Sequence, residues 1–287
     1  MTNVMTWGMV VPPTREVSTL SAAKLTWLGT AGFRIRDESG VSLVDPFLSG
    51  RSAKARPAQP LEAADMADAD RIFVSHGHFD HIADVPSIVA VSGARVFCSG
   101  VARDTLLRLG VPASLVTVVD GGKELDLGPL RVSVFPTSHI RFDRALILRT
   151  APRVLRLRNV GLLGEVSGKP AGPVLVFRFD TGGASIVHMG SLGIVPEEAG
   201  RYGLKGADVL LPALQGHAHI CSMAARVTAA VGPRAVVPQH FDDFFPPVSQ
   251  WVELMPFEAM VARLSPGTKC HRPEINREFD VSVLLDG

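Results

Sequence analysis

The chain of 287 residues is long enough for one large domain or two small ones, with a substantial buried core. Hydrophobic residues make up 46% and charged residues 20%, a balance typical of a compact folded protein and not of a disordered one. The net charge of +1 gives no global attraction to nucleic acid or to another strongly charged partner.

Short apolar runs dominate the first half of the chain and predict strands. The run around Ile72-Phe73-Val74 has no alternation, which suits a strand buried on both faces. Gly-containing breaks separate the three runs that open the series, as in a meander. We expect strands at 24–29, 33–37, 41–45, 70–75, 95–99, 115–120 and 130–139, and helices at 84–93 and 100–110.

The second half repeats this pattern. Two apolar runs flank Thr181-Gly182-Gly183, which is a plausible hairpin turn. The remaining segments predict strands at 173–180, 184–190, 207–213, 234–240 and 278–286, a helix at 221–232, and a partly helical stretch at 248–266 that breaks at Pro256. This order of elements is typical of mixed sheets flanked by helices, in a layered α/β architecture within a single domain over residues 1–287.

One segment departs from the pattern. Residues 141–170 hold seven basic residues against two acidic ones, mixed with Leu, Ile and Val. We interpret the segment as an insertion that covers a site as a lid. Arg153, Arg156 and Arg158 would then bind phosphate or carboxylate groups of a substrate, contact an anionic membrane surface, or simply be solvated. The lack of interleaved aromatic residues argues against nucleic-acid binding.

The cysteines and the N-terminal segment give an indication of the cellular compartment. An odd, scattered set, Cys98, Cys221 and Cys270, is neither a disulfide framework nor a zinc ribbon. The apolar run near the N-terminus is short, follows no basic residue, and ends at Pro12-Pro13. It resembles neither a signal peptide nor a span of roughly 20 apolar residues. We therefore expect a cytoplasmic protein, and the sequence makes no prediction of its oligomeric state.

Three histidines and an aspartate lie within the six residues "HGHFDH" at 76–81, directly after an apolar strand. In an extended loop His76 and His78 point the same way, so that both can bind one cation. Asp80 and His81 follow and can serve a second cation. Neutral imidazole suits zinc, iron or manganese, and a carboxylate among imidazoles is typical of catalytic metal sites.

This stretch is similar to the H-x-H-x-D-H signature of the metallo-β-lactamase superfamily. The segment 25–50 also resembles the branch that includes ascorbate-6-phosphate lactonase and the phospholipase D acting on N-acyl-phosphatidylethanolamine. The resemblance extends over residues 24–245. It implies an α/β fold: an αββα four-layer sandwich of two mixed β-sheets flanked by helices, with metals at one edge between the sheets.

The resemblance also implies the metal ligands. His76, His78 and His139 would hold one metal ion, and Asp80, His81 and His240 the other. One or two divalent ions are expected, zinc first, with manganese or iron as alternatives.

The sequence departs from the family at the aspartate that normally bridges both metals. Ser191 follows Gly190 where that aspartate is expected, and Asp180 lies one strand too early, in a turn. Two divalent ions about 3.5 Å apart repel by about 19 kcal/mol at an effective dielectric of 20. Losing one carboxylate should therefore leave one metal site weaker, unless a substrate oxyanion completes it.

Several other residues are candidates with two interpretations each. Asp45 either orients a metal-binding histidine or ends a strand before Pro46. His217 and His219 have metal-like spacing near a substrate entrance, but equally suit a surface loop at a helix start. Cys221 is better explained as a small buried residue than as a nucleophile.

The residues and the resemblance together predict a metal-dependent hydrolase. A metal-bound hydroxide would attack an ester-like small molecule, a lactone or a phosphodiester, with Asp80 orienting the nucleophile. The expected substrate is an anion. Two alternatives remain open: a non-hydrolytic enzyme using a redox metal in a biosynthetic pathway, and a metal- or ligand-binding protein of this fold that has lost hydrolysis.

Overall fold

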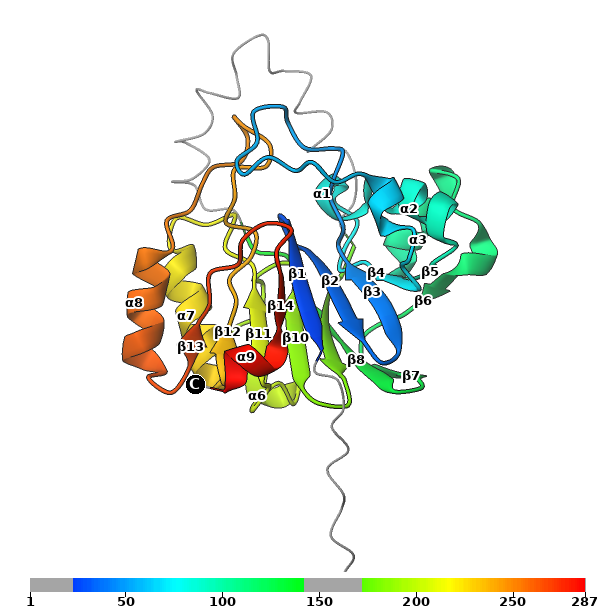
Figure 1. The fold of residues 1–287 in the computed structure, drawn as a ribbon. Coiled ribbons are helices and arrows are strands. Elements are labelled where there is room, and N and C mark those ends of the chain that lie inside the picture. The colour runs from blue at the N-terminus through cyan, green and yellow to red at the C-terminus, as the bar shows by residue number, and fades with distance from the viewer. Residues whose placement is uncertain (1–22, 142–171, 287) are drawn as a thin grey trace, which may run out of the picture.

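The computed structural model describes residues 23–141 and 172–286, which form two seven-stranded sheets packed face to face (Figure 1). The first sheet has the order β14 (Glu278–Asp280), β1 (Lys24–Gly29), β2 (Gly32–Asp37), β3 (Gly40–Val44), β4 (Arg71–Phe73), β5 (Arg95–Cys98), β6 (Val116–Val118). The second has the order β13 (Lys269–Cys270), β12 (Ala235–Val236), β11 (Val209–Pro212), β10 (Ser185–Met189), β9 (Val174–Asp180), β8 (Leu130–Thr137), β7 (Lys123–Leu127).

Both sheets are mixed. Strands β3 to β6 pair in parallel, and so do β10 to β13, whereas the remaining pairs are antiparallel. Helices complete the outer layers: α1 (Phe79–Ile82), α2 (Val85–Ser92), α3 (Gly100–Arg108), α6 (Pro196–Arg201), α7 (Ile220–Val231), α8 (Met255–Leu264) and α9 (Val281–Leu285). This arrangement confirms the predicted four-layer sandwich.

The core between the sheets is aromatic. Phe73 on β4 contacts Phe177 and Phe179 on β9, with ring centroids 5.4 and 5.0 Å apart. A separate apolar layer lies on the other face of the first sheet, where Ile88 of α2 and Leu106 of α3 are fully buried. None of the helices in the described residues is both long and apolar enough to span a bilayer.

Two sequence expectations near the C-terminus are wrong. The predicted strand 278–286 ends at Asp280, because β14 pairs only with the first three residues of β1; beyond it the chain forms α9 and buries Val281 and Leu284. Pro256 does not break a helix but lies in the first turn of α8, where a missing N–H costs no hydrogen bond. The polar edge strand β7 was not predicted, since its exposed Lys and Glu hide the apolar alternation.

The topology brings several strand ends to one edge of the sandwich. Strands β3, β4, β8, β10 and β12 all run toward it and end there. The loops that follow those strands therefore meet at this edge, and they carry the candidate site.

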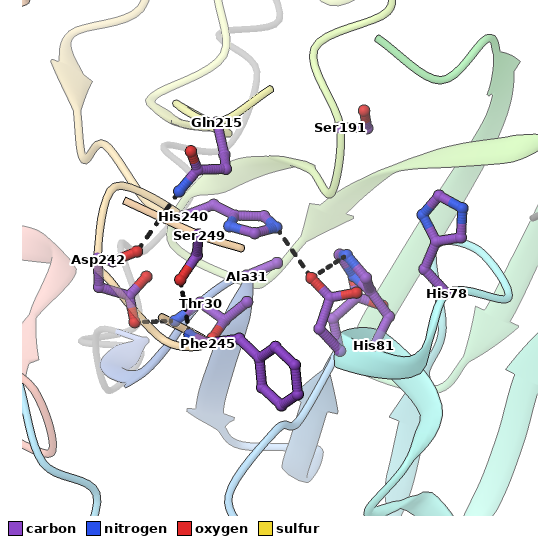
Figure 2. A network of polar contacts seen from close by, with 12 residues as sticks. Thr30, Ala31, His78, His81, Ser191, Gln215, His240, Asp242, Phe245 and Ser249 are labelled. Carbon is purple, nitrogen blue, oxygen red and sulfur yellow. Dashed lines mark hydrogen bonds and ion pairs between the residues drawn. The ribbon is translucent and has the colours of Figure 1, made fainter. Parts of the chain in front are cut away.

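A buried ion pair ties these loops together. The Nη2 atom of Arg51 lies 2.7 Å from Oδ2 of Asp242, and the side chains are only 3% and 0% exposed. The same carboxylate oxygen accepts from the backbone N–H of Thr30 at 3.0 Å, and Arg51 donates to the Thr30 hydroxyl and to the Pro57 carbonyl. His240 in turn donates its backbone N–H to the Thr30 carbonyl at 2.8 Å. Figure 2 shows Asp242, Thr30 and His240 in this arrangement.

Replacing Arg51 with Met should lower the free energy of unfolding by about 3–5 kcal/mol, because it leaves the Asp242 carboxylate buried and uncompensated. Urea unfolding at neutral pH measures the difference. Arg103→Met is the matched control, since the Arg103–Asp104 pair is about half exposed; it should cost about 0.2–1 kcal/mol. Equal losses in the two variants would contradict a structural role for the buried pair.

Candidate metal centre

Six side chains from three parts of the chain meet at the edge where the strands end. His76 follows β4, His139 follows β8, and His240 follows β12. His78 directly precedes α1, whose first turn supplies Asp80 and His81. They form two triads in which donor atoms lie within 4.8 Å of one another: His76, His78 and His139 in the first, and Asp80, His81 and His240 in the second.

The imidazoles of the first triad are poised to bind as neutral ligands. Nε2 of His76 lies 3.0 Å from Nδ1 of His78, a distance at which two nitrogens share either a proton or a cation. Burial lowers the pKa of His76 well below its usual range, with neighbouring histidines, His81 first, adding to the effect. Burial and then His139 lower the pKa of His78 to about 4.

The second triad is built around a carboxylate. Oδ2 of Asp80 lies 3.3 Å from Nε2 of His240 and 3.7 Å from Nε2 of His81. Figure 2 shows His81 and His240 facing one another. Burial alone would raise the pKa of Asp80, but His81 and His240 outweigh it and lower that pKa far below its usual range. Asp80 therefore remains ionised. The two triads are contiguous, because the rings of His76 and His81 lie 4.0 Å apart.

Asp45 contacts the second triad directly and the first triad through Ser75. Its Oδ2 accepts from Nδ1 of His81 at 2.8 Å, which leaves Nε2 to face Asp80. The hydroxyl of Ser75 donates to the same Asp45 oxygen and lies 3.0 Å from Nδ1 of His76. Asp45 both follows the end of β3 and contacts His81, so its role in orienting a metal-binding histidine stays a prediction. Ser75 was not predicted, and its only sequence signal was its position at the end of the apolar run.

The ring of His139 is oriented by the backbone. Nδ1 of His139 donates to the Ile140 carbonyl at 2.8 Å, so that Nε2 carries the lone pair. Three residues of the site have left-handed backbone, Thr30, Asp45 and His240, with φ of 51°, 44° and 59°. Such conformations cost energy in non-glycine residues and cluster at functional sites.

The orientation of the ring nitrogens suits the binding of divalent cations. In both triads the protonated ring nitrogens of His81 and His139 face protein acceptors, and their other nitrogens face the centre. Five imidazoles and one carboxylate form a donor set that suits zinc, iron or manganese. The residues therefore fit one or two such ions.

Ser191 follows β10 beside the triads, as the sequence suggested. It is only 4% exposed, and its hydroxyl accepts from the backbone N–H of Ile140 at 3.1 Å. A side chain at Gly190 would overlap Ser75, and one at Gly193 would overlap the Ser138 carbonyl, so the segment passes very close to both neighbouring loops. In this arrangement Ser191 helps position the loop that carries His139. Its occupation of the bridging position stays a prediction.

Asp180 lies at the other end of the sheet. It ends β9, pairs with Ser185 at the beginning of β10, and forms an ion pair with Arg178 at 3.0 Å. This position agrees with a structural role. Likewise His188 is a fully buried strand residue whose Nε2 contacts the Ala31 carbonyl at 2.8 Å.

The other candidates lie apart from the triads or outside the described residues. His217 and His219 adjoin the N-terminus of α7, with ring centroids 5.8 Å apart, and belong to neither triad. Burial raises the pKa of Cys221, which does not favour a nucleophile. Arg153, Arg156 and Arg158, with nearly all of the predicted insertion 141–170, lie outside the described residues.

An aromatic wall borders the second triad, and the sequence interpretation missed it. The ring centroid of Phe244 lies 5.2 Å from that of His240. Phe79, between the two signature residues His78 and Asp80, packs against Phe244, Phe245 and Phe47. Phe47, Phe79 and the Phe244–Phe245 pair are far apart in sequence, and only the fold brings them together.

Comparison with known proteins agrees with this geometry. Residues 24–240 match the family described as the β-lactamase superfamily domain. A UPF0173 metal-dependent hydrolase of Anaeromyxobacter dehalogenans is 30% identical over 232 residues, covering 77% of this chain and 75% of the relative. The chain therefore belongs to the β-lactamase superfamily and, within it, to the family of UPF0173 metal-dependent hydrolases. The predicted superfamily is confirmed.

Solved structures share the fold at low identity. Igni18, a metallo hydrolase of Ignicoccus hospitalis, is 19% identical with a TM-score of 0.63, covering 90% of this chain and 98% of that one. CmlA, a diiron β-hydroxylase of Streptomyces venezuelae, is 17% identical with a TM-score of 0.59, covering 91% of this chain and 55% of that one. At these identities the likeness concerns the fold alone.

The metal-free protein should lose stability as the pH falls from 6.5 towards 4. The pKa of His78 is lowered from 6.5 to about 4, so the unfolded chain binds a proton in this window that the folded chain does not. Urea unfolding at a series of pH values, in the presence of a chelator, should show this loss. The slope should be smaller in His78→Asn, and identical slopes would contradict the lowered pKa.

The two metal sites should differ in affinity. The carboxylate of Asp80 alone offsets the repulsion between the two cations, whereas the family normally adds a second, bridging carboxylate. Ser191→Asp should strengthen the weaker site. Calorimetric zinc titration measures both affinities. Ser191→Ala is the control, since it removes the acceptor for Ile140 without adding charge. Two equally tight sites in the wild type, unaffected by the aspartate, would show that another residue bridges.

Proposed function

We propose that this chain is a metal-dependent hydrolase that cleaves an ester-like, anionic small molecule. The observation that supports it most is the pair of contiguous triads, whose donor atoms converge at one sheet edge. Membership of a family of metal-dependent hydrolases supports the same reaction class. We propose zinc as the metal, with manganese or iron as alternatives that suit the same donors.

Bound at the triads, a divalent cation lowers the pKa of water and stabilises negative charge on an oxygen. The protein's own groups prepare the site for this chemistry. Burial keeps His76 and His78 neutral at physiological pH, so their lone pairs are available without loss of a proton. Asp45 and Ser75 hold the rings of His81 and His76 in the required orientation.

Asp80 is assigned to orienting the attacking water. A carboxylate with so low a pKa accepts a hydrogen bond well but holds a proton poorly. Asp80 therefore acts as a ligand and an acceptor and is a poor general base. His81 and His240 both contact its Oδ2 atom.

The surroundings suggest the substrate class. Phe79 and Phe244 would border an apolar part of the substrate next to the reacting group. Arg153, Arg156 and Arg158 supply the cationic groups in the insertion, and His217 and His219 adjoin a neighbouring loop. The sequence resemblance to a sugar-phosphate lactonase and a phospholipase D supports a lactone or a phosphodiester.

Replacing His76 and His78 together with Ala should lower metal content and reduce hydrolysis by about 100-fold or more, since even residues that only orient ligands contribute 10–100-fold. Elemental analysis of freshly purified protein measures the metal. Lactone and phosphodiester substrates measure the activity. His271→Ala, a half-buried histidine outside both triads, is the control and should change neither.

Full activity in the double variant would contradict the proposed centre. A fully zinc-loaded wild type that hydrolyses none of these substrates would favour a binding protein that has lost hydrolysis. Iron or manganese in the purified protein, with no hydrolysis, would favour a redox enzyme. The last two outcomes would therefore distinguish the two alternative functions from the proposed hydrolysis.

A further inference from the structure

A hollow of about 910 Å³ lies beside the metal centre and shares none of the six triad residues. Its apolar walls include Trp27, Phe241 and Trp251, and Lys54 and Arg56 also line it. We call it the Trp251 hollow. Its volume is within the range of about 300–1,000 Å³ typical of small-molecule sites.

Hydrogen bonds join the four chain segments that line the hollow. Arg56 and Asp243 exchange backbone hydrogen bonds at 2.9 and 3.0 Å, which join the segment after β3 to the segment after β12. The loop between β13 and β14 joins β1, where Asn276 donates its backbone N–H to the Trp27 carbonyl. Gln59 links this loop to the first segment through a side-chain hydrogen bond to Asn276 at 3.1 Å. The walls are therefore preorganised.

Aromatic surface remains uncovered inside it. Trp27 and Phe241 stack at 4.8 Å and are almost fully buried, whereas Trp251 meets Phe241 edge to face at 5.3 Å. Trp251 remains 46% exposed. A half-exposed indole beside stacked rings offers a surface for another flat apolar group.

The charged side chains that line the hollow differ in whether they have a polar partner. The two acids already have partners: Asp243 accepts from the Ser249 hydroxyl at 2.6 Å, and Glu274 forms an ion pair with Arg277 at 2.7 Å. Within the described residues, the side chains of Lys54 and Arg56 form no ion pair or hydrogen bond. The hydroxyl of Ser249 is neutral and does not cancel the charge of Asp243, but the two cations without an ion pair outnumber that one acid, and this excess of positive charge favours an anion.

We infer that the Trp251 hollow is a second binding site, for a small aromatic anion. The flat ring system would pack against the exposed indole of Trp251, and the anionic group would contact Lys54 and Arg56. This inference does not depend on hydrolysis at the metal centre.

Fluorescence titration with anilinonaphthalene sulfonate, an aromatic anion, tests the inference in the full-length protein. One saturable site is expected, with equal affinity in metal-loaded and chelated protein. Arg56→Gln and Trp251→Ala should each weaken binding by about tenfold, as for the loss of one charged or aromatic contact. The neutral analogue phenylnaphthylamine should bind more weakly and be insensitive to Arg56→Gln.

Two matched control variants test whether the loss of affinity is specific to residues that line the hollow. Arg263→Gln removes an exposed arginine elsewhere, and Met255→Ala removes an apolar side chain that is 68% exposed; neither should change the affinity. Affinity unchanged in Arg56→Gln and Trp251→Ala, unsaturable binding, or equal affinity for the neutral dye would overturn the inference. So would binding that is lost on chelation, because it would place the dye at the triads.

Discussion

The site depends on one buried carboxylate, Asp80, surrounded by imidazoles. Asp80 is only 7% exposed and contacts His81 and His240. A buried charge is tolerated only where partners compensate it, and here the partners are rings that could also protonate. Burial keeps His76 and His78 neutral, whereas Asp45 and Asp80 outweigh burial and raise the pKa of His81. The negative charge thus concentrates in the second triad, and the first triad is neutral.

Three further buried carboxylates hold the loops that carry this arrangement. Asp45 orients His81, Asp242 pairs with Arg51 next to His240, and Asp84 accepts from the backbone of Leu48 and Ser49 at 2.7 and 3.2 Å. Loops usually lack the hydrogen bonds that fix helices and strands. Here each carboxylate replaces them with charge-assisted bonds in a low-dielectric environment. The positions of the triad side chains therefore depend on carboxylates that lie outside the triads.

Most of the fold and the six triad residues could be predicted from the sequence, because strong patterns mark them. The strands are apolar runs separated by glycine, and four of the ligands occupy one short signature. His139 and His240 needed the family resemblance, since each is an isolated histidine after a strand. Ser75, the Arg51–Asp242 pair and the Phe79–Phe244 wall could not be predicted, because their partners lie far apart in sequence. The helix α9 was missed because an unpaired strand end leaves no local signal.

The segment that follows β12 belongs to both sites. His240 faces Asp80, the next residue, Phe241, lines the Trp251 hollow, and Asp242 is locked to Arg51. Because these three residues are consecutive and His240 has left-handed backbone, a shift of the chain at one of them must move the others. The buried ion pair resists such a shift, since moving Asp242 would separate opposite charges at low dielectric. An occupant of the hollow and a cation at the second triad would therefore contact neighbouring residues of one rigid segment, and because neither needs to move that segment, each should bind without changing the affinity of the other.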